Sequence, residues 1–421
     1  MSSITLLRGY EILDSRGRPT VLTLCELSSG VQGMASVPSG ASTGKAEALE
    51  LRDGDPARYR GLGCLRAVTN VNEAIHNALR GKTFASQEAL DEALITLDGT
   101  PNKSRLGANA ILSVSLAFAR ACAAEQGLPL YSYFGQMAGV PTASLPRPMI
   151  NLFSGGKHAG GQTDLQDVLI IPWSARTFEQ AMVDAYAVYQ AAADLILGRY
   201  GMRSLTADEG GLAPPFASNE SMLADAAAAI ERAGLVPGVD VRLALDVASS
   251  HFYTDEVYRL GQELLSGEQM IERLAGWTQT YPLVSIEDGL AEDDWEHWAR
   301  LRQTLPPGIL ALGDDLLCTH PARIQRAIDQ QAANALLLKV NQIGTLTEAQ
   351  RSAALARSAG WSLVVSARSG ETEDHWLADL AVGFAGDYIK IGSITQSERL
   401  AKYNRLLMLE RDTSLPMKQG H

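Results

Sequence analysis

The chain has little cysteine, and the cysteines it has are far apart. Among its 421 residues there are four, Cys25, Cys64, Cys122 and Cys318, and their positions show no paired spacing. Domains that are held together by disulfides carry cysteines in dense, regular patterns. The scatter therefore argues against a disulfide framework and favours a protein of the reducing cytoplasm.

Two further absences narrow the possible partners. No apolar stretch reaches the length of about 20 residues that a membrane-spanning helix needs, and no signal peptide is recognisable at the start. No block of Lys and Arg offsets the formal net charge of -12. We therefore expect neither a nucleic-acid nor a membrane partner. A negatively charged substrate would need local help from a bound cation or from clustered Lys and Arg.

Hydrophobic sequence is abundant, at 46% of the residues, and the length favours at least two domains. The N-terminal part alternates in the manner of strands over residues 4–12, 20–27 and 31–37, with turn residues between these runs. Apolar residues then follow helical spacing from about Ala46 to Gln126. This pattern predicts an antiparallel meander with helices, an α+β domain over residues 1–138.

A proline-rich segment, Gly139–Pro148, marks the predicted domain boundary. From there on, strand-like runs alternate with helical sequence at the spacing of βα units. Residues 139–421 are therefore predicted to form an eight-stranded barrel of the TIM type.

Charged residues end five short apolar runs in this second part, and this is the most informative pattern in the chain. The runs are Val241–Asp246, Leu283–Glu287, Ile309–Asp314, Ala335–Lys339 and Asp387–Lys390. An apolar run of this length between helices is typical of a buried parallel strand. Because the carboxyl ends of barrel strands meet at one mouth, where barrel enzymes carry their chemistry, these five side chains are expected to lie together.

The three acids and the two lysines point to different parts of one site. Oxygen ligands suit Mg²⁺, so Asp246, Glu287 and Asp314 are candidate metal ligands; the alternative is that they cap helices or pair with surface lysines. A lysine that is partly desolvated near another cation has a lowered pKa and can act as a base. The alternative for Lys339 and Lys390 is that they only neutralise the acids.

Two loop motifs allow more than one interpretation. Either acid of Asp208–Glu209, which stand before two glycines, could be a general acid, although the spacing fits a turn better. The segment Ser39–Lys45 superficially resembles a phosphate-binding loop. It is one residue short between its glycines, and Ala46 stands where such a loop has Ser or Thr, so a mobile lid is the better interpretation.

Nine longer motifs, in order, resemble those of the enolase family, and the resemblance covers nearly the whole chain. They are Glu11–Gly17, Ser39–Gly44, Leu97–Asn109, Asp208–Gly211, Ala244–Ser250, Ser285–Gly289, Lys339–Thr345, Arg368–Asp374 and Ser397–Asn404. The resemblance implies an N-terminal α+β domain and a modified eight-stranded barrel, usually in a homodimer.

It also implies an activity and its cofactor. Enolases remove the proton next to the carboxylate of 2-phosphoglycerate and expel hydroxide to give phosphoenolpyruvate, with two Mg²⁺ ions at the active site. By resemblance, Asp246, Glu287 and Asp314 bind the first ion. Ser42, in the mobile loop, helps to bind the second ion together with the substrate phosphate.

The remaining roles follow from the same resemblance. Lys339 is the base, and Glu209 assists the departure of hydroxide. Lys390 contacts the substrate carboxylate, and Arg368 and Ser369 hold the phosphate.

Several positions near the expected substrate depart from the family pattern. His158 is retained as a substrate-binding residue, but Asp167 stands where the family has glutamate. Ala367 replaces a histidine, and Gln396 replaces an arginine. Ile391 and Ser154 stand where the family has threonine and asparagine.

This selective pattern leaves three functions open. One is an ordinary enolase. The second is a specialised paralogue, similar to carboxyphosphonoenolpyruvate synthase of phosphonate and phosphinate antibiotic pathways, which acts on an altered or larger phosphorylated or phosphonate carboxylic acid. The third is a non-catalytic binding protein of the same fold, which the intact metal and lysine positions disfavour.

Overall fold

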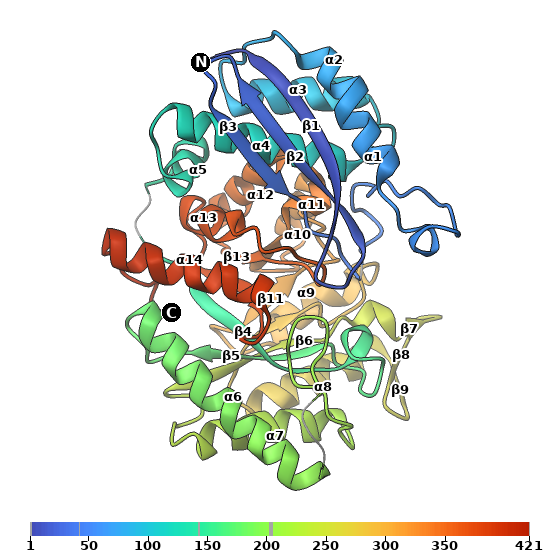
Figure 1. Ribbon diagram of the computed structural model, residues 1–421. Helices are drawn as coiled ribbons and strands as arrows, with labels where there is room; N and C mark the ends of the chain where they lie inside the picture. The colour runs from blue at the N-terminus through green and yellow to red at the C-terminus, as the bar shows by residue number, and fades with distance from the viewer. Residues whose placement is uncertain (1, 42, 142–143, 202–204, 421) are drawn as a thin grey trace.

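The computed structural model describes residues 2–41, 43–141, 144–201 and 205–420. An antiparallel sheet with its helices stands against a closed barrel of eight strands, above it in the view of Figure 1. The chain thus has the predicted fold class, an α+β domain followed by a barrel of the TIM type.

The N-terminal sheet is an antiparallel meander whose strand ends differ from the predicted ones by no more than one residue. Its strands are β1 (Ile4–Leu13), β2 (Pro19–Leu27) and β3 (Gln32–Ser36). Asp14 closes the first turn, because its carboxylate accepts hydrogen bonds from the backbone N–H of Arg16 (2.8 Å) and Arg18 (2.9 Å). Gly17 takes a positive φ of 69° there, which a glycine adopts without strain.

The helices of this domain are α1 (Leu65–Asn70), α2 (His76–Leu79), α3 (Gln87–Asp98), α4 (Ala108–Glu125) and α5 (Leu130–Ala138). Of these, α1, α2 and α4 pack against the sheet, and α3 and α5 pack against α4. The Ala-rich α4 is buried along almost its whole length because it packs against β2 and β3 on one side and against α11 and α12 of the barrel on the other. α5 ends at Ala138, and the division into domains of residues 1–138 and 139–421 stays a prediction.

The predicted helical region is wrong at its start. Between residues 46 and 64 the chain forms loops and one short 3₁₀ turn, and the first α-helix begins at Leu65. Glycines and a proline interrupt this segment, and its backbone bonds to side chains instead: the Asp53 carboxylate accepts from the N–H groups of Leu65 (3.0 Å) and Arg66 (2.8 Å). The helical spacing of the apolar residues was not enough to form a helix across these glycines and this proline.

The barrel closes with seven strands in one direction and β5 in the opposite one, because β5 pairs antiparallel with both β4 and β6. Around the ring the order is β10-β11-β12-β13-β14-β4-β5-β6. Their bounds are β4 (Arg147–Ser154), β5 (Asp167–Pro172), β6 (Val241–Asp246), β10 (Leu283–Glu287), β11 (Leu310–Gly313), β12 (Ala335–Leu338), β13 (Ser362–Ser366) and β14 (Tyr388–Gly392).

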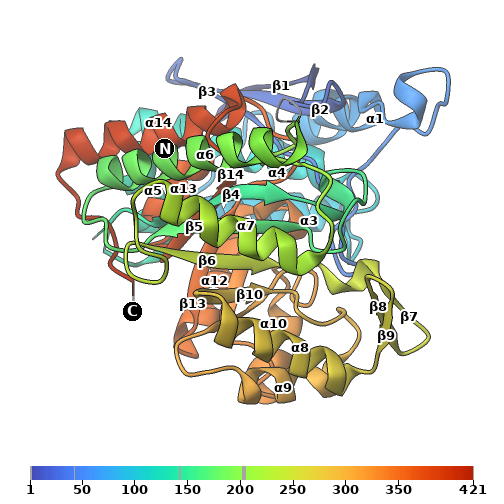
Figure 2. The ribbon, with the colours of Figure 1, turned by 90° about the horizontal axis from the view of Figure 1, so that it is seen from below.

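Helices surround the barrel, and Figure 2 shows α6 and α7 side by side along one flank. The helices are α6 (Phe178–Tyr200), α7 (Asn219–Arg232), α8 (Gly267–Thr280), α9 (Trp295–Thr304), α10 (Pro321–Asp329), α11 (Val340–Ile343), α12 (Leu346–Ser358), α13 (Trp376–Gly383) and α14 (Ser397–Thr413). A small sheet of β7 (Tyr253–Thr254), β8 (Val257–Leu260) and β9 (Glu263–Leu265) projects from the barrel.

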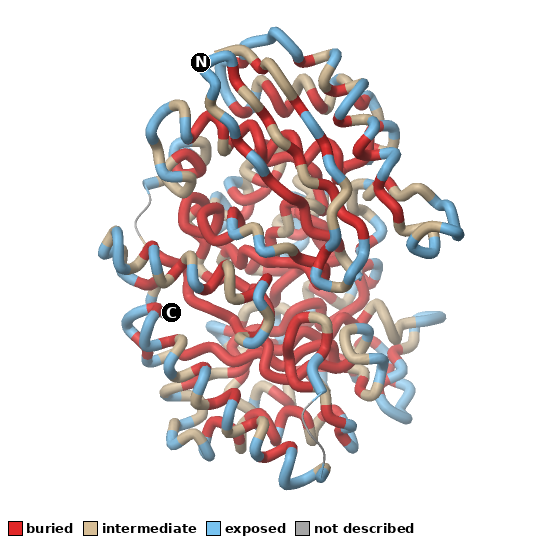
Figure 3. The backbone as a smooth tube through the Cα atoms, viewed as in Figure 1, coloured by how far each residue is buried: buried red, intermediate tan, exposed pale blue. Residues whose placement is uncertain are grey.

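Burial concentrates in the barrel wall and beneath the N-terminal sheet, as the red segments of Figure 3 show. Inside the barrel, side chains such as Leu169, Leu312, Leu337 and Val364 form a separate apolar cluster. This cluster fills the lumen below the mouth, so that the barrel is a packed core and not a channel. In the part of the chain that the structure describes, no helix combines the length and apolarity needed to cross a membrane.

The contact of β3 with α4 gives a stability prediction. A Cβ atom on Gly33 would lie 2.2 Å from the backbone oxygen of Ala117 and 2.4 Å from the backbone nitrogen of Ala121. Because backbone atoms cannot move aside cheaply, Gly33→Ala should lower the free energy of unfolding by about 1–3 kcal/mol. The urea midpoint measures this loss. Gly198→Ala, in α6 with open space around it, is the control and should be neutral or stabilising by up to about 1 kcal/mol.

Candidate active site

The structure brings the five predicted charged residues to one mouth of the barrel. Asp246 and Glu287 end β6 and β10, while Asp314 and Lys339 directly follow β11 and β12. Lys390 is the one departure from the predicted pattern, because it lies in the middle of β14 and not at its end. All five side chains are largely or fully buried.

Lys390 joins two of the acids. Its Nζ atom donates hydrogen bonds to Asp246 Oδ2 (2.8 Å) and to Glu287 Oε2 (2.6 Å). Burial alone would raise the pKa of Asp246, but the nearby ammonium outweighs it and lowers that pKa. Glu287 behaves differently: burial and the negative charge of Asp246 raise its pKa well above the usual range. Burial would lower the pKa of Lys390, but the two carboxylates raise it well above its ordinary value.

Glu287 has one oxygen without a partner. Among the described residues, its Oε1 atom is buried and accepts no hydrogen bond. A buried carboxylate oxygen left in this way is costly unless a cation or a donor meets it. This oxygen is the strongest local sign that the mouth is shaped for a positively charged ligand.

Asp314 is held by two groups. It forms an ion pair with the ammonium of Lys339, and its Oδ1 atom accepts a hydrogen bond from Gln342 Nε2 (2.8 Å). Burial would lower the pKa of Lys339, but Asp314 outweighs it and raises that pKa. The expected lowered pKa of a lysine base is therefore wrong for this arrangement. The reason is that Lys339 lies against a carboxylate as well as near other cations.

A second cluster lies beside Glu209. The Nδ1 atom of His158 is 2.8 Å from Asp167 Oδ2, and Ser154 Oγ donates to Asp167 Oδ1 (2.5 Å). Asn151 Nδ2 donates to Glu209 Oε2 (3.1 Å). Ligating atoms of His158, Asp167 and Glu209 lie within 4.8 Å of one another. The predicted substrate-binding residues His158 and Asp167 thus lie close to the predicted general acid, Glu209.

The protonation of this cluster is set by mutual charge. Burial would lower the pKa of His158, but Asp167 and Glu209 outweigh it and raise that pKa to about 9. Burial raises the pKa of Asp167. For Glu209 burial acts in the same direction, but the charge of His158 outweighs it and lowers the pKa. His158 therefore holds a proton at neutral pH, and Glu209 is ionised.

The predicted phosphate-binding pair lies at the end of β13. Arg368 Nη1 donates to Asn341 Oδ1 (2.9 Å), and its guanidinium pairs with Glu47 at 3.2 Å. The Oγ atom of Ser369 accepts a hydrogen bond from Arg16 Nη1 (3.0 Å). The N-terminal domain thus reaches the barrel mouth through Arg16 and Glu47. Ser42, the predicted ligand of a second metal ion, lies outside the described residues.

Sequence reasoning missed several residues of the mouth. Gln166 donates to Asp246 Oδ2 (3.2 Å), and Asp288, Asp314 and Asp315 place ligating oxygens within 4.8 Å of one another. Among the described residues Asp246, Glu287 and Asp314 do not form so tight a group. The acid pair Asp314–Asp315 was a signal in the sequence, but nothing there could show that Asp288 binds the N–H groups of both.

The positions that depart from the family pattern border this site. Ala367 lies at the end of β13, where its N–H donates to the carbonyl of Lys390 (2.8 Å), and it is 6% exposed. The Gln396 carboxamide lies against the backbone carbonyls of Ala207 and Asp208, next to Glu209. Ser154 is the donor to Asp167 described above.

Comparison with models of protein families accounts for this arrangement. Residues 4–134 match the N-terminal domain of enolase, and residues 142–417 match the C-terminal TIM barrel domain of enolase. The chain belongs to the enolase family. Members of this family are typically Mg²⁺-dependent enzymes of the lyase type, and they commonly act on small substrates and form oligomers.

The mouth of the barrel fits such a cofactor by its donor set. Asp246, Glu287 and Asp314 offer only oxygen, the ligand that Mg²⁺ prefers. Glu287 Oε1 already lacks a partner among the described residues. Lys390 and Lys339 neutralise the same three carboxylates and would have to shift for a cation to bind.

The His158 cluster gives a prediction about protonation. In a titration followed by side-chain NMR, His158 should change charge at a pH of about 9. Asp167→Asn should lower this pKa, because it removes the largest favourable charge and leaves burial in place. Asp164→Asn is the control: Asp164 lies three residues away and bonds Asn219 and Gly261 instead. A midpoint that stays near 9 in the Asp167 variant would contradict the assigned cause.

Proposed function

We propose that this protein abstracts the proton next to the carboxylate of a 2-phosphoglycerate or phosphoenolpyruvate type of substrate, with Lys339 as the base. The single observation that supports it most is the composition of the mouth. Three carboxylates and three cations, Lys339, Lys390 and Arg368, lie largely buried at the mouth, and among the described residues Glu287 keeps a carboxylate oxygen without a partner. A substrate with a carboxylate and a phosphate complements such a site.

In this proposal the cations divide the substrate between them. Lys390 reaches the centre of the barrel and would contact the substrate carboxylate. Arg368 and Ser369, at the end of β13, would hold the phosphate, and Arg368 would exchange Glu47 for it. A guanidinium suits a phosphate because its N–H groups match two oxygens at once.

The metal ligands would be Asp246, Glu287 and Asp314, with Ser42 helping at a second ion. When bound, Mg²⁺ supplies positive charge where the substrate carboxylate gains negative charge on loss of its proton. The Asp314 carboxylate would then interact with the metal ion as well, and this would weaken its ion pair with Lys339. Lys339 could release its proton and take up the substrate proton at Nζ.

On the far side of the substrate, Glu209 would assist the departure of hydroxide, while His158 and Asp167 would bind the substrate. His158 carries the available proton in this structure, because the carboxylates of Asp167 and Glu209 raise its pKa to about 9. The proton that leaves with hydroxide can therefore come from this cluster, with Glu209 as its partner.

A second candidate is favoured by Ala367 and Asp167. Both side chains are shorter than those of the family pattern, and hydrogen bonds with Ser154 and His158 fix the position of the Asp167 carboxylate. Shorter side chains leave room for a larger phosphorylated or phosphonate carboxylic acid. The protein would then be a specialised paralogue of the carboxyphosphonoenolpyruvate synthase type, with the same proton abstraction by Lys339.

Lys339→Ala tests the base. The variant should lower kcat by at least about 10³-fold, because a positioned base contributes about 10²–10⁴ and the Asp314 charge loses its partner. It should also stop exchange of the substrate α-proton with heavy water. Lys418→Ala is the matched control, since Lys418 pairs with Asp387 outside the mouth, and it should keep the parental rate. Continued proton exchange in Lys339→Ala would remove Lys339 as the base.

The two candidate substrates are separated by the rate on 2-phosphoglycerate. With Mg²⁺, a rate within about tenfold of a known enolase, or about 1.4 kcal/mol of barrier, supports an ordinary enolase. If the rate is lower by orders of magnitude, Ala367→His together with Gln396→Arg should raise it, and phosphonate co-substrates become the next test. Mg²⁺ binding without turnover of any of these substrates would support the non-catalytic protein instead.

A further inference from the structure

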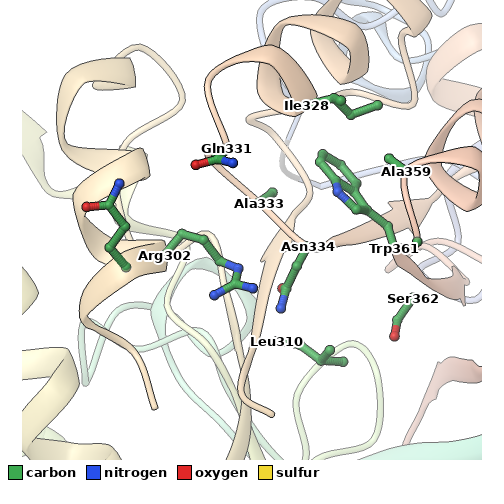
Figure 4. A pocket seen from close by; sticks show the side chains of 11 residues that line it. Arg302, Leu310, Ile328, Gln331, Ala333, Asn334, Ala359, Trp361 and Ser362 are labelled. Carbon is green, nitrogen blue, oxygen red and sulfur yellow. The ribbon is translucent and has the colours of Figure 1, made fainter. Parts of the chain in front are cut away.

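A hollow of about 600 Å³ lies at the end of the barrel opposite to the candidate active site. Leu310 and Ser362, which begin β11 and β13, and Asn334, just before β12, line it from the barrel wall. Figure 4 shows Arg302 of α9, Gln331 after α10 and Trp361 before β13 around the same space. Because the mouth residues lie at the other ends of these strands, the hollow is a separate site.

The barrel side of this hollow is rigid. Asn334 Oδ1 accepts a hydrogen bond from the N–H of Ala311 (2.7 Å), and its Nδ2 donates to the carbonyl of Ile309 (3.2 Å). The Asn334 carbonyl in turn accepts from the N–H of Ser362 (3.1 Å). Asn334 therefore ties the beginnings of three strands together through its side chain and its backbone, and the hollow is formed before any ligand arrives, as ligand pockets usually are.

The charge of the hollow is positive in a protein of net charge -12. Its lining includes Arg302 but, among the described residues, neither Asp nor Glu. Within the same described set, Arg302 shows neither an ion pair nor a side-chain hydrogen bond. Its neighbour Arg300, two positions earlier on the same helix, pairs with Glu268. A guanidinium with no acid beside it, in a concave space, is suited to a carboxylate or a phosphate.

The rest of the lining suits a flat, partly apolar body. Leu310, Ile328 and Ala333 are apolar, and Trp361 exposes 8% of its surface. Gln331 has a positive φ of 54°, a conformation that costs a residue with a side chain of this size about 1 kcal/mol, and glycine is usual after a helix end. The side chain of Gln331 borders the hollow at this position. The volume lies within the range of small-molecule sites.

We propose that this hollow binds a small organic anion, whose carboxylate or phosphate meets Arg302 and whose flat body lies beside Trp361. A smaller cavity of about 170 Å³ shares Leu310, Asn334 and Ser362 with it and is also lined by Asp387 and Lys418, which pair with each other. The unpaired cation is therefore confined to the hollow around Arg302 among the described residues that line these two cavities. This proposal does not depend on the reaction proposed for the mouth.

The test uses the full chain labelled with 5-fluorotryptophan. The protein has six tryptophans, and Trp361→Phe assigns the fluorine resonance of Trp361. The probes are benzoate and adenosine 5′-monophosphate, which carry the two kinds of anion on a flat body, and benzamide, which has the shape of benzoate without its charge. We expect at least one anion to shift the Trp361 resonance in a saturable manner, and benzamide to leave it in place.

Two variants on α9 decide whether Arg302 is the anion contact. Arg302→Gln should weaken binding of that anion at least about tenfold, since a hydrogen bond to a charged group contributes more than a neutral one. Arg300→Gln, which removes an equal charge outside the hollow, should keep the parental affinity. Arg302→Lys, which keeps the charge without the planar fork, should bind with intermediate affinity.

Four outcomes would overturn the proposal. Three of them are saturation by neither anion, equal binding of benzamide and benzoate, and unchanged affinity in Arg302→Gln. A Trp361 resonance that stays in place while other tryptophan resonances move would equally place the anion elsewhere, and would also overturn it. None of these measurements depends on turnover at the mouth, so the failure of this proposal can be told apart from the failure of the proposed reaction.

Discussion

The hydrogen bonds of Lys390 are the constraint on which the site depends. Around the ring, β14 is three strands from β6 and four from β10, so that Lys390 meets Asp246 and Glu287 across the lumen and not along the wall. Such an arrangement exists only when the barrel is closed. The burial of three charges is tolerable because each finds an opposite charge, and removal of one partner from a buried pair costs about 3–5 kcal/mol.

The same charges are the ones that the proposed ligands would engage. Lys339 and Lys390 neutralise the carboxylates that are proposed to bind Mg²⁺, and Glu47 neutralises the arginine that is proposed to bind phosphate. Each internal pair therefore stands in for a contact with a ligand. Glu287 Oε1 is the place where this internal neutralisation is incomplete among the described residues. A ligand with both signs of charge, a cation together with a phosphorylated acid, would replace the pairs without leaving a buried charge alone.

The N-terminal domain takes part in this balance. Arg16 reaches Ser369, Glu47 reaches Arg368, and Gln342 lies between Glu47 and Asp314. Movement of the segment that contains Glu47 would therefore change the contacts of Arg368 and, through Gln342, those of Asp314. In the described part of the chain, no such domain covers the far end of the barrel, and its hydrogen-bonded edge at Asn334 borders the hollow around Arg302.

The sequence by itself determined the five apolar runs that become β6, β10, β11, β12 and β14 and most of the charges at their ends, because a buried strand needs a continuous apolar run and tolerates a charge only where the barrel opens. Asp246, Glu287, Asp314 and Lys339 could be found in this way. That β5 runs against the other strands was decided by the tertiary structure. Only the tertiary structure decided which charge meets which. It paired Lys339 with Asp314, which raises the pKa of that lysine, placed Asp288 beside Asp314, and brought Glu47 to Arg368 over a separation of 321 residues. These contacts depend on the closure of the barrel and on the docking of the first domain, and neither leaves a periodic signal in the chain.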